Sequence, residues 1–214
     1  MKKVIRNREI NIQDYINQEH FSSRNISQFN RLFSKAIPFP CLVVDNFLRE
    51  EIAVKLLKAL SKEKFYPKES DLFKLSQTSD FAGTKNPVLV EFREVLSSES
   101  FVRFLGKVTG NKLVAGKIDM AGAIYSDTDF LLCHDDKLEG RRIAYIYYLS
   151  DFSISDGGSL SLFSSENSMP KKAVKKILPK FNRLAFFEVS DISFHEIEDV
   201  VSEKQRISIN GWFY

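Results

Sequence analysis

The second half of the chain consists of short runs of strand-forming residues that leave almost no room for helices between them. From residue 112 onward, turn residues such as Asp127, Gly140 and Asn182 separate these runs. About eight short strands without intervening helices are typical of a jelly roll, in which two antiparallel sheets face each other. The expected strands are residues 112–118, 122–125, 130–133, 143–149, 159–163, 184–189, 193–197 and 207–213, with a helical turn at residues 171–178. This half therefore predicts a double-stranded β-helix core, the cupin-like jelly roll.

The first half has the period of helices. Residues 49–62 and 86–105 place apolar residues three and four positions apart, with a break in the second segment near residues 97–100. Residues 11–36 are expected to be helical in part and to end at the prolines of Pro-Phe-Pro (38–40). Strand-like pieces are expected at residues 41–44 and 72–81. The whole chain predicts an α+β fold. An N-terminal helical extension (1–37) is followed by one domain (38–214), with helical support at 38–111 and the jelly-roll core at 112–214.

Composition excludes several classes of protein. Hydrophobic residues make up 43%, which indicates a globular chain, and the net charge of +3 is too small to indicate nucleic acid as the main partner. No apolar run approaches the roughly 18 residues of a membrane span. The charged residues 1–9 do not resemble a signal peptide, and Cys41 and Cys133 are expected to be buried, reduced thiols. We therefore expect a cytoplasmic protein.

Two of the three histidines, with one aspartate, form a candidate metal site; the third histidine is His20. His134 and Asp136 follow an apolar strand, and in a strand residues two apart share one face. His195 lies 61 residues later in another predicted strand. Two imidazoles and one carboxylate are the ligand set of non-haem iron(II) oxygenases. Taken alone, His-x-Asp is a weak signal, because a histidine at a strand end is often a hydrogen-bonded structural residue.

Arg206 adds a second element, eleven residues after His195. Strand alternation places Arg206, Ser208 and Asn210 on one face, and a turn at residues 198–204 would set this strand beside that of His195. A guanidinium that points into a barrel requires an anion, and its planar fork matches a carboxylate such as that of 2-oxoglutarate. The alternative is an ordinary surface ion pair, for example with Glu196.

The same residues carry a resemblance to a known family. The matching stretches include Cys-His-Asp-Asp-Lys-Leu-Glu-Gly-Arg-Arg-Ile-Ala (133–144) and Arg-Ile-Ser-Ile-Asn-Gly-Trp-Phe (206–213). The others are residues 38–48, 71–78, 157–163, 186–190 and 193–195. Over residues 38–214 the chain resembles the catalytic domain of the 2-oxoglutarate- and Fe(II)-dependent prolyl hydroxylases, in particular the eukaryotic ribosomal-protein prolyl 3-hydroxylases. Those proteins carry a second jelly-roll domain in addition to the catalytic domain.

The resemblance implies roles for individual residues. His134, Asp136 and His195 would hold Fe(II), and Arg206 would bind 2-oxoglutarate, with Tyr148, Tyr125 and Ser208 as further candidates beside it. Tyr148 and Tyr125 have the simpler interpretation of core aromatic residues, and Trp212 is expected either beside the pocket or in the core. The implied reaction consumes 2-oxoglutarate and O2, with L-ascorbate as a candidate reductant. It would hydroxylate a prolyl residue of a protein, with a ribosomal protein as the specific expectation.

Three alternatives stay open at this point. A small-molecule or other side-chain hydroxylase would use the same chemistry, a non-catalytic jelly roll would only bind a ligand, and a cupin-like pocket would hold zinc or manganese. Lysines 171, 172, 175 and 176 recur at i, i+4 spacing, which is typical of a solvated helix face rather than of a nucleic-acid site.

Overall fold

A computed structural model describes residues 10–214, so the expectation about a signal peptide in residues 1–9 lies outside the described residues. Within residues 10–214 there are four α-helices and eleven β-strands. The helices are α1 (Ser23–Ser34), α2 (Glu50–Leu60), α3 (Pro87–Ser97) and α4 (Glu99–Thr109). The strands are β1 (Cys41–Val44), β2 (Tyr66–Ser70), β3 (Phe73–Gln77), β4 (Ala121–Tyr125), β5 (Phe130–His134), β6 (Ile143–Tyr148), β7 (Leu160–Glu166), β8 (Met169–Ile177), β9 (Arg183–Glu188), β10 (His195–Ile197) and β11 (Arg206–Phe213).

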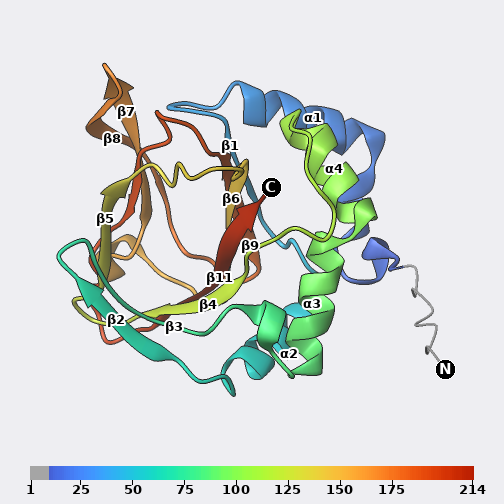
Figure 1. Cartoon of the computed structure of the whole chain (residues 1–214), viewed down its shortest axis with the longest axis horizontal. Helices are drawn as coiled ribbons and strands as arrows, with labels where there is room; N and C mark the ends of the chain where they lie inside the picture. Colours follow the sequence, from blue (N-terminus) through green and yellow to red (C-terminus); the bar gives the residue numbers. More distant parts are fainter. Residues whose placement is uncertain (1–9) are drawn as a thin grey trace.

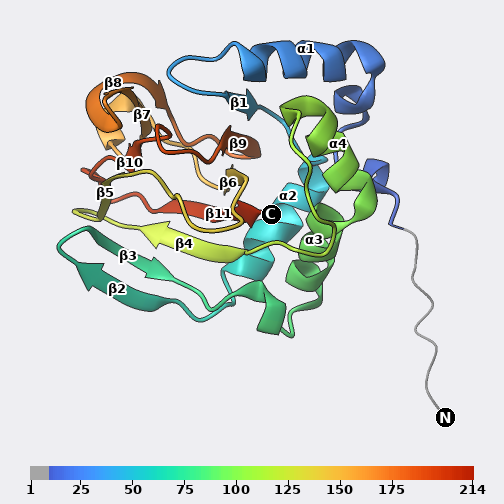
Figure 2. The ribbon, with the colours of Figure 1, turned by 45° about the horizontal axis from the view of Figure 1, so that its top comes forward.

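The strands form one curled antiparallel sheet with the order β1-β9-β6-β11-β4-β3-β5-β10-β7-β8, and β2 pairs with β3. The helices gather on one side of this sheet, next to β6, β9 and β11 (Figure 1). A second view shows the same division, with α1 to α4 on one side and β4, β3 and β2 stacked away from α1 (Figure 2). The sheet curls around an interior that the helices leave open, which positions a site inside the barrel.

Strand alternation divides the apolar residues into two cores. On β6, Tyr145 and Tyr147 pack with the helices, whereas Ala144 and Tyr148 face the inside of the barrel. The period of two produces this division, because successive side chains of a strand point to opposite faces. On β11 the buried Ile209 belongs to the helix-facing core. The polar residues of β11 are thereby turned inward.

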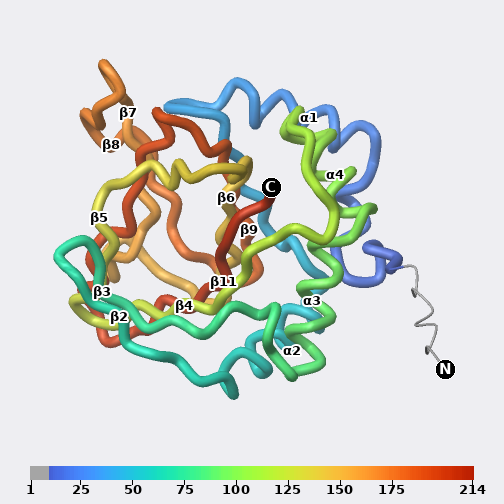
Figure 3. The backbone as a smooth tube through the Cα atoms, in the orientation of Figure 1, coloured from blue at the N-terminus to red at the C-terminus, as the bar shows by residue number. Residues whose placement is uncertain are grey.

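Three details of the predicted secondary structure are wrong. Residues 171–177 of the expected helical turn lie instead in strand β8, which forms with β7 a hairpin that projects from the barrel (Figure 3). Asn167 and Ser168 have φ of 51° and 56° and lie between the paired Glu166 and Met169. A two-residue turn of this kind joins antiparallel strands, so a hairpin forms here in spite of the helix propensity of the lysines. Residues 112–118 form no strand: Gly116 lies at a φ of 78°, and Ile118 makes an isolated bridge with Phe213. Strand β2 was not predicted, because its five residues are all exposed and carry no apolar alternation.

The N-terminal helix packs on the same core as the rest of the chain. Phe33 of α1 is buried, and its ring stacks on that of Phe186 in β9, with 5.7 Å between the centroids. The division into residues 1–37 and 38–214 stays a prediction. Within residues 10–214, no helix has both the length and the apolar character needed to span a bilayer.

A buried asparagine links the β1–α2 connection to the barrel. The side chain of Asn182 accepts hydrogen bonds from the backbone N–H of Leu48 and from the Tyr147 hydroxyl, each 2.8 Å long. Its amide group donates to the carbonyl of Leu48 at 2.7 Å. Leu48 and Tyr147 are both fully buried, so water cannot replace these partners.

Asn182→Ala is therefore expected to lower the free energy of unfolding by about 2–5 kcal/mol, because two buried donors would lose their acceptor. The measurement is urea unfolding of the metal-free protein. Asn167→Ala is the matched control, since Asn167 has a similar positive φ but lies in an exposed turn. The control is expected to lose about 1–2 kcal/mol from backbone strain alone. Equal losses in the two variants would show that the buried network contributes nothing.

Candidate active site

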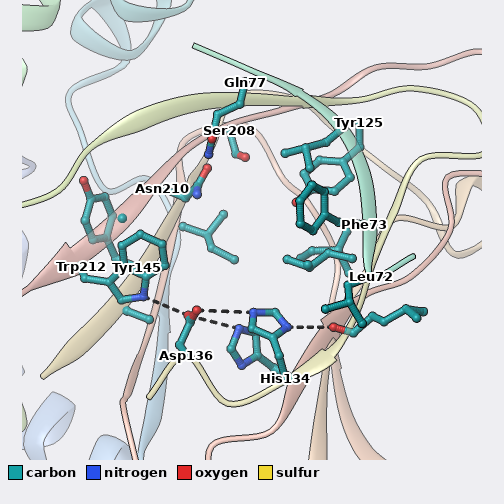
Figure 4. Close-up of a pocket in the computed structure, with 18 of the residues that line it drawn as sticks. Leu72, Phe73, Gln77, Tyr125, His134, Asp136, Tyr145, Ser208, Asn210 and Trp212 are labelled. Carbon is teal, nitrogen blue, oxygen red and sulfur yellow. Dashed lines mark hydrogen bonds and ion pairs between the residues drawn. The ribbon is translucent and has the colours of Figure 1, made fainter. Parts of the chain in front are cut away.

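A pocket of about 430 Å³ opens into the barrel. Its walls are formed by β2, β3, β4, β5, β6, β9, β10 and β11, and by the segment that carries Asp136. Figure 4 shows Asp136, His134 and Trp212 at one end and Tyr125, Ser208 and Gln77 at the other. The pocket therefore has two polar ends joined by a largely apolar wall.

His134, Asp136 and His195 meet at the first of these ends. His134 is the last residue of β5 and His195 the first of β10, and the two lie opposite each other in the paired strands. The ring centroids are 4.2 Å apart. One ligand atom from each of the three residues lies within 4.8 Å of the others, a grouping that could hold a metal ion. The structure thus brings together the three residues that the sequence singled out.

Asp136 reaches the cluster in a way that the sequence does not indicate. Strand alternation after His134 was expected to place the carboxylate, but β5 ends at His134. Asp136 instead has a φ of 61°, in the left-handed region, which aspartate tolerates better than most residues. The expected convergence is correct, whereas the expected reason for it is wrong.

Hydrogen bonds fix the tautomer of both imidazoles. Nδ1 of His134 lies 2.8 Å from the carbonyl oxygen of Leu132, and Nδ1 of His195 lies 2.8 Å from that of Ser193. A carbonyl oxygen can only accept, so each Nδ1 carries the hydrogen. In the neutral rings, Nε2 therefore keeps a free lone pair on the side of Asp136.

The charges within the cluster are coupled. Burial alone would raise the pKa of Asp136, but the adjacent His134 and His195 outweigh it and hold this pKa well below its usual range. Burial alone would lower the pKa of His134, yet the Asp136 carboxylate raises it above the ordinary value. Asp136 is therefore ionised at neutral pH, as a metal ligand must be.

Arg206 lies in the interior of the barrel with only 1% of its surface exposed. Its Nε donates to the carbonyl of Gly158 at 2.8 Å and its Nη1 to Ser208 Oγ at 3.4 Å. Its Nη2 is buried and has no hydrogen-bond partner among residues 10–214. The surface ion pair with Glu196 is therefore ruled out. The strand of Arg206 was expected to lie beside the strand of His195, and this is also wrong. Strand β11 pairs with β4 and β6, whereas β10 pairs with β5 and β7.

The three additional candidates surround Arg206. Its guanidinium lies 5.0 Å from the ring centroids of both Tyr125 and Tyr148, and Ser208 is buried beside it. The Tyr148 hydroxyl is buried without a partner. Burial raises the pKa of Tyr125 to about 12 and raises the pKa of Tyr148, although Arg206 opposes both shifts. Both hydroxyls therefore remain protonated donors at neutral pH.

Sequence reasoning missed two polar residues and misjudged another. Arg141 contacts both Asp136 and Trp212, and Gln77 lines the other end of the pocket. Arg141 was missed because nothing in the local sequence distinguishes it from Arg142. Cys41 is buried as expected, whereas Cys133 is half-buried and lines the pocket. His20 is buried near Asn46, at the N-terminal end of the fold, and takes no part in the cluster.

Comparison with known proteins places this geometry in a family. Residues 120–214, which include the three clustered residues and Arg206, match the family model of the 2OG-Fe(II) oxygenase superfamily. The chain contains a 2OG-Fe(II) oxygenase domain. The family implies Fe(II), 2-oxoglutarate and O2 for this domain.

Curated relatives extend the similarity beyond the oxygenase domain. The chain is 39% identical to the prolyl 3-hydroxylase OGFOD1 of Xenopus laevis over 92% of its own length and 39% of that protein. It is 44% identical to the mouse prolyl 3-hydroxylase OGFOD1, over 83% of this chain and 33% of that protein. The chain thus spans between a third and two-fifths of the length of these relatives.

Solved structures confirm the fold. A prolyl-4-hydroxylase of Pseudomonas putida superimposes with a TM-score of 0.67 at 16% identity, covering 86% of this chain and 97% of that one. A prolyl hydroxylase of Trichoplax adhaerens, solved in complex with a hypoxia inducible factor peptide, gives a TM-score of 0.67 at 18% identity, covering 90% and 93%. The chain has the predicted double-stranded β-helix core with packed helices.

Proposed function

We propose that the chain is an Fe(II)- and 2-oxoglutarate-dependent dioxygenase that hydroxylates a prolyl residue of a protein, with release of succinate and CO2. The observation that carries the proposal is the pairing of the metal-ligand cluster with a buried Arg206 that has no anionic partner in the described part of the chain. Relatives named as prolyl 3-hydroxylases support the choice of proline. A ribosomal protein as substrate, ascorbate as reductant and a cytoplasmic location stay predictions.

The residues of the pocket fit the two groups that the family implies. His134, Asp136 and His195 would hold Fe(II), since two imidazole Nε2 atoms and a carboxylate suit this ion and leave positions for other ligands. The buried, unpartnered Nη2 of Arg206 and hydroxyl of Tyr148 would donate to the distal carboxylate of 2-oxoglutarate. An unpaired buried charge is unfavourable, so an anion bound here would compensate the charge of Arg206.

The chain itself contributes orientation and exclusion of water. Bound ferrous iron would supply the oxidation of a C–H bond, coupled to decarboxylation of 2-oxoglutarate. Arg206 would fix the co-substrate by its distal carboxylate, so that its keto acid end faces the cluster. The apolar wall between the two ends, formed by residues such as Leu75, Leu131 and Phe187, would keep the reacting groups from bulk water.

The test is succinate formation from 2-oxoglutarate by protein loaded with Fe(II) without oxygen and then supplied with O2. Proline-containing ribosomal peptides are added in parallel, and mass spectrometry detects the gain of one oxygen atom. The matched control replaces the target proline of each peptide with alanine. Hydroxylation of the proline peptides alone supports the proposal. Succinate without any peptide product would favour a small-molecule hydroxylase, and no binding of Fe(II) or 2-oxoglutarate would favour a non-catalytic module.

A further inference from the structure

The carboxylate of Asp136 is contacted from a side that the imidazoles do not occupy. Nε1 of Trp212 donates a hydrogen bond to Asp136 Oδ2 at 3.0 Å. Figure 4 shows Asp136 between the Trp212 indole and the His134 imidazole. The two imidazole Nε2 atoms lie further away, each 3.4 Å from a carboxylate oxygen. Because only the indole contact has normal hydrogen-bond length, it is the tightest restraint on this side chain.

Arg141 supports both partners of this bond. Its guanidinium carbon lies 3.4 Å from the centroid of the Trp212 ring, so it stacks on the indole. Its Nη1 donates to the backbone carbonyl of Asp136 at 3.3 Å and lies 3.7 Å from Oδ1. Arg141 thus fixes the indole against the Asp136 segment and adds a positive charge beside the carboxylate.

The backbone on the other side of Asp136 is also held. The buried Ser193 donates through Oγ to the carbonyl of Asp135 at 2.9 Å. With the main chain fixed at Asp135 and Asp136, the remaining freedom is rotation of the Asp136 side chain. Trp212 restricts that freedom.

We infer that Trp212 and Arg141 are positioning residues that hold the Asp136 carboxylate in its metal-binding orientation before a metal arrives. The inference rests on the proposed function, because it assumes that Asp136 is a metal ligand. Hydrogen-bond partners of metal ligands raise metal affinity by preorganising the site, and their loss weakens binding by about 10- to 100-fold.

The test measures binding of Mn(II) alone to the metal-free chain. Trp212→Phe removes the N–H and keeps an aromatic ring, whereas Arg141→Met keeps an aliphatic stem and removes the charge. In each variant the dissociation constant for Mn(II) is expected to rise by about tenfold or more. In the double variant the loss of Mn(II) affinity is expected to be smaller than the product of the two single losses, because both residues act on one carboxylate. The absorption bands of the Co(II)-substituted protein are expected to change in both variants.

Arg142→Met is the matched control, since it removes the same charge one residue away, and it should bind Mn(II) like the wild type. Normal Mn(II) affinity in both Trp212→Phe and Arg141→Met would overturn the inference, as would a lowered unfolding midpoint with unchanged affinity. If Trp212→Phe does not fold, Arg141→Met alone decides in the same way. A wild type whose Mn(II) binding does not depend on Asp136, tested with Asp136→Ala, would instead overturn the proposed function and this inference with it.

Discussion

Arg206→Met is expected to remove 2-oxoglutarate binding while leaving the metal-free protein about as stable as the wild type. The guanidinium is buried with one nitrogen unpartnered, so its charge is not compensated in the absence of an anion. Replacing a buried charge with an apolar side chain of similar size is often neutral or stabilising, by about 1–4 kcal/mol. The lost hydrogen bond to the Gly158 carbonyl opposes this gain by about 1 kcal/mol. We therefore expect the free energy of unfolding to fall by no more than about 1 kcal/mol.

The affinity of Arg206→Met for 2-oxoglutarate, unlike its stability, is expected to fall strongly. Removing one partner of a buried ion pair costs about 3–5 kcal/mol, which corresponds to a loss of affinity of about 10²- to 10⁴-fold. The measurement is unfolding of the metal-loaded protein with and without 2-oxoglutarate. At a ligand concentration of about 100 times the Kd of the wild type, the wild type should gain about 2.7 kcal/mol, and Arg206→Met should gain less than about 0.5 kcal/mol.

Two further variants sharpen this result. Arg206→Lys keeps the charge but loses the planar fork and should recover only part of the affinity. Ser208→Ala should lower the affinity for 2-oxoglutarate less than Arg206→Met does. It removes only the 3.4 Å contact with Arg206 and leaves the guanidinium in place. Full stabilisation of Arg206→Met by 2-oxoglutarate would show that its distal carboxylate binds elsewhere. A large loss of stability in the metal-free variant would show that Arg206 is chiefly structural.

His134→Ala is expected to abolish succinate formation and to weaken Fe(II) binding by more than about 100-fold. Loss of an outer hydrogen-bond partner already costs about 10- to 100-fold, so loss of a ligand should exceed it. His134 is at the end of β5 and partly exposed, so its removal should leave the fold intact. The measurements are anaerobic Fe(II) titration, succinate formation and circular dichroism of the same preparation.

His20→Ala is the matched control for this variant. It removes an imidazole that lies outside the pocket, where it contacts the carbonyl of Asn46, so Fe(II) affinity and turnover should equal those of the wild type. Equal losses in the two histidine variants would point to general destabilisation. Undiminished succinate formation by His134→Ala would exclude His134 as a ligand and contradict the proposed site.

Local patterns predicted much of the candidate site. The alternation along residues 206–210 placed Arg206 and Ser208 on one face, and the structure buries both inside the barrel. This inference succeeds because the period of a strand is a property of the backbone and needs no knowledge of neighbours. The helices at 50–60 and 87–109 were predicted for the same reason, since their apolar spacing is local.

Such local patterns did not predict contacts between segments that are distant in the sequence. Residues 171–177 have helix-forming lysines, yet pairing with β7 through the Asn167–Ser168 turn makes them a strand. Arg141 and Arg142 are equivalent in the sequence, but only the folded chain stacks Arg141 on Trp212. The left-handed conformation of Asp136 likewise depends on a connection whose ends are held by other elements.

The sequence by itself determined the fold class, the metal-ligand candidates and the candidate anion-binding arginine, because these follow from residue type and local period. Only the tertiary structure decided that β10 lies between β5 and β7, so that His195 faces His134 across paired strands. It alone showed that Arg206 is buried without an anionic partner, and that Trp212 and Arg141 hold Asp136. Strand pairing and burial are set by long-range packing, which depends on the whole chain and not on any one segment of it.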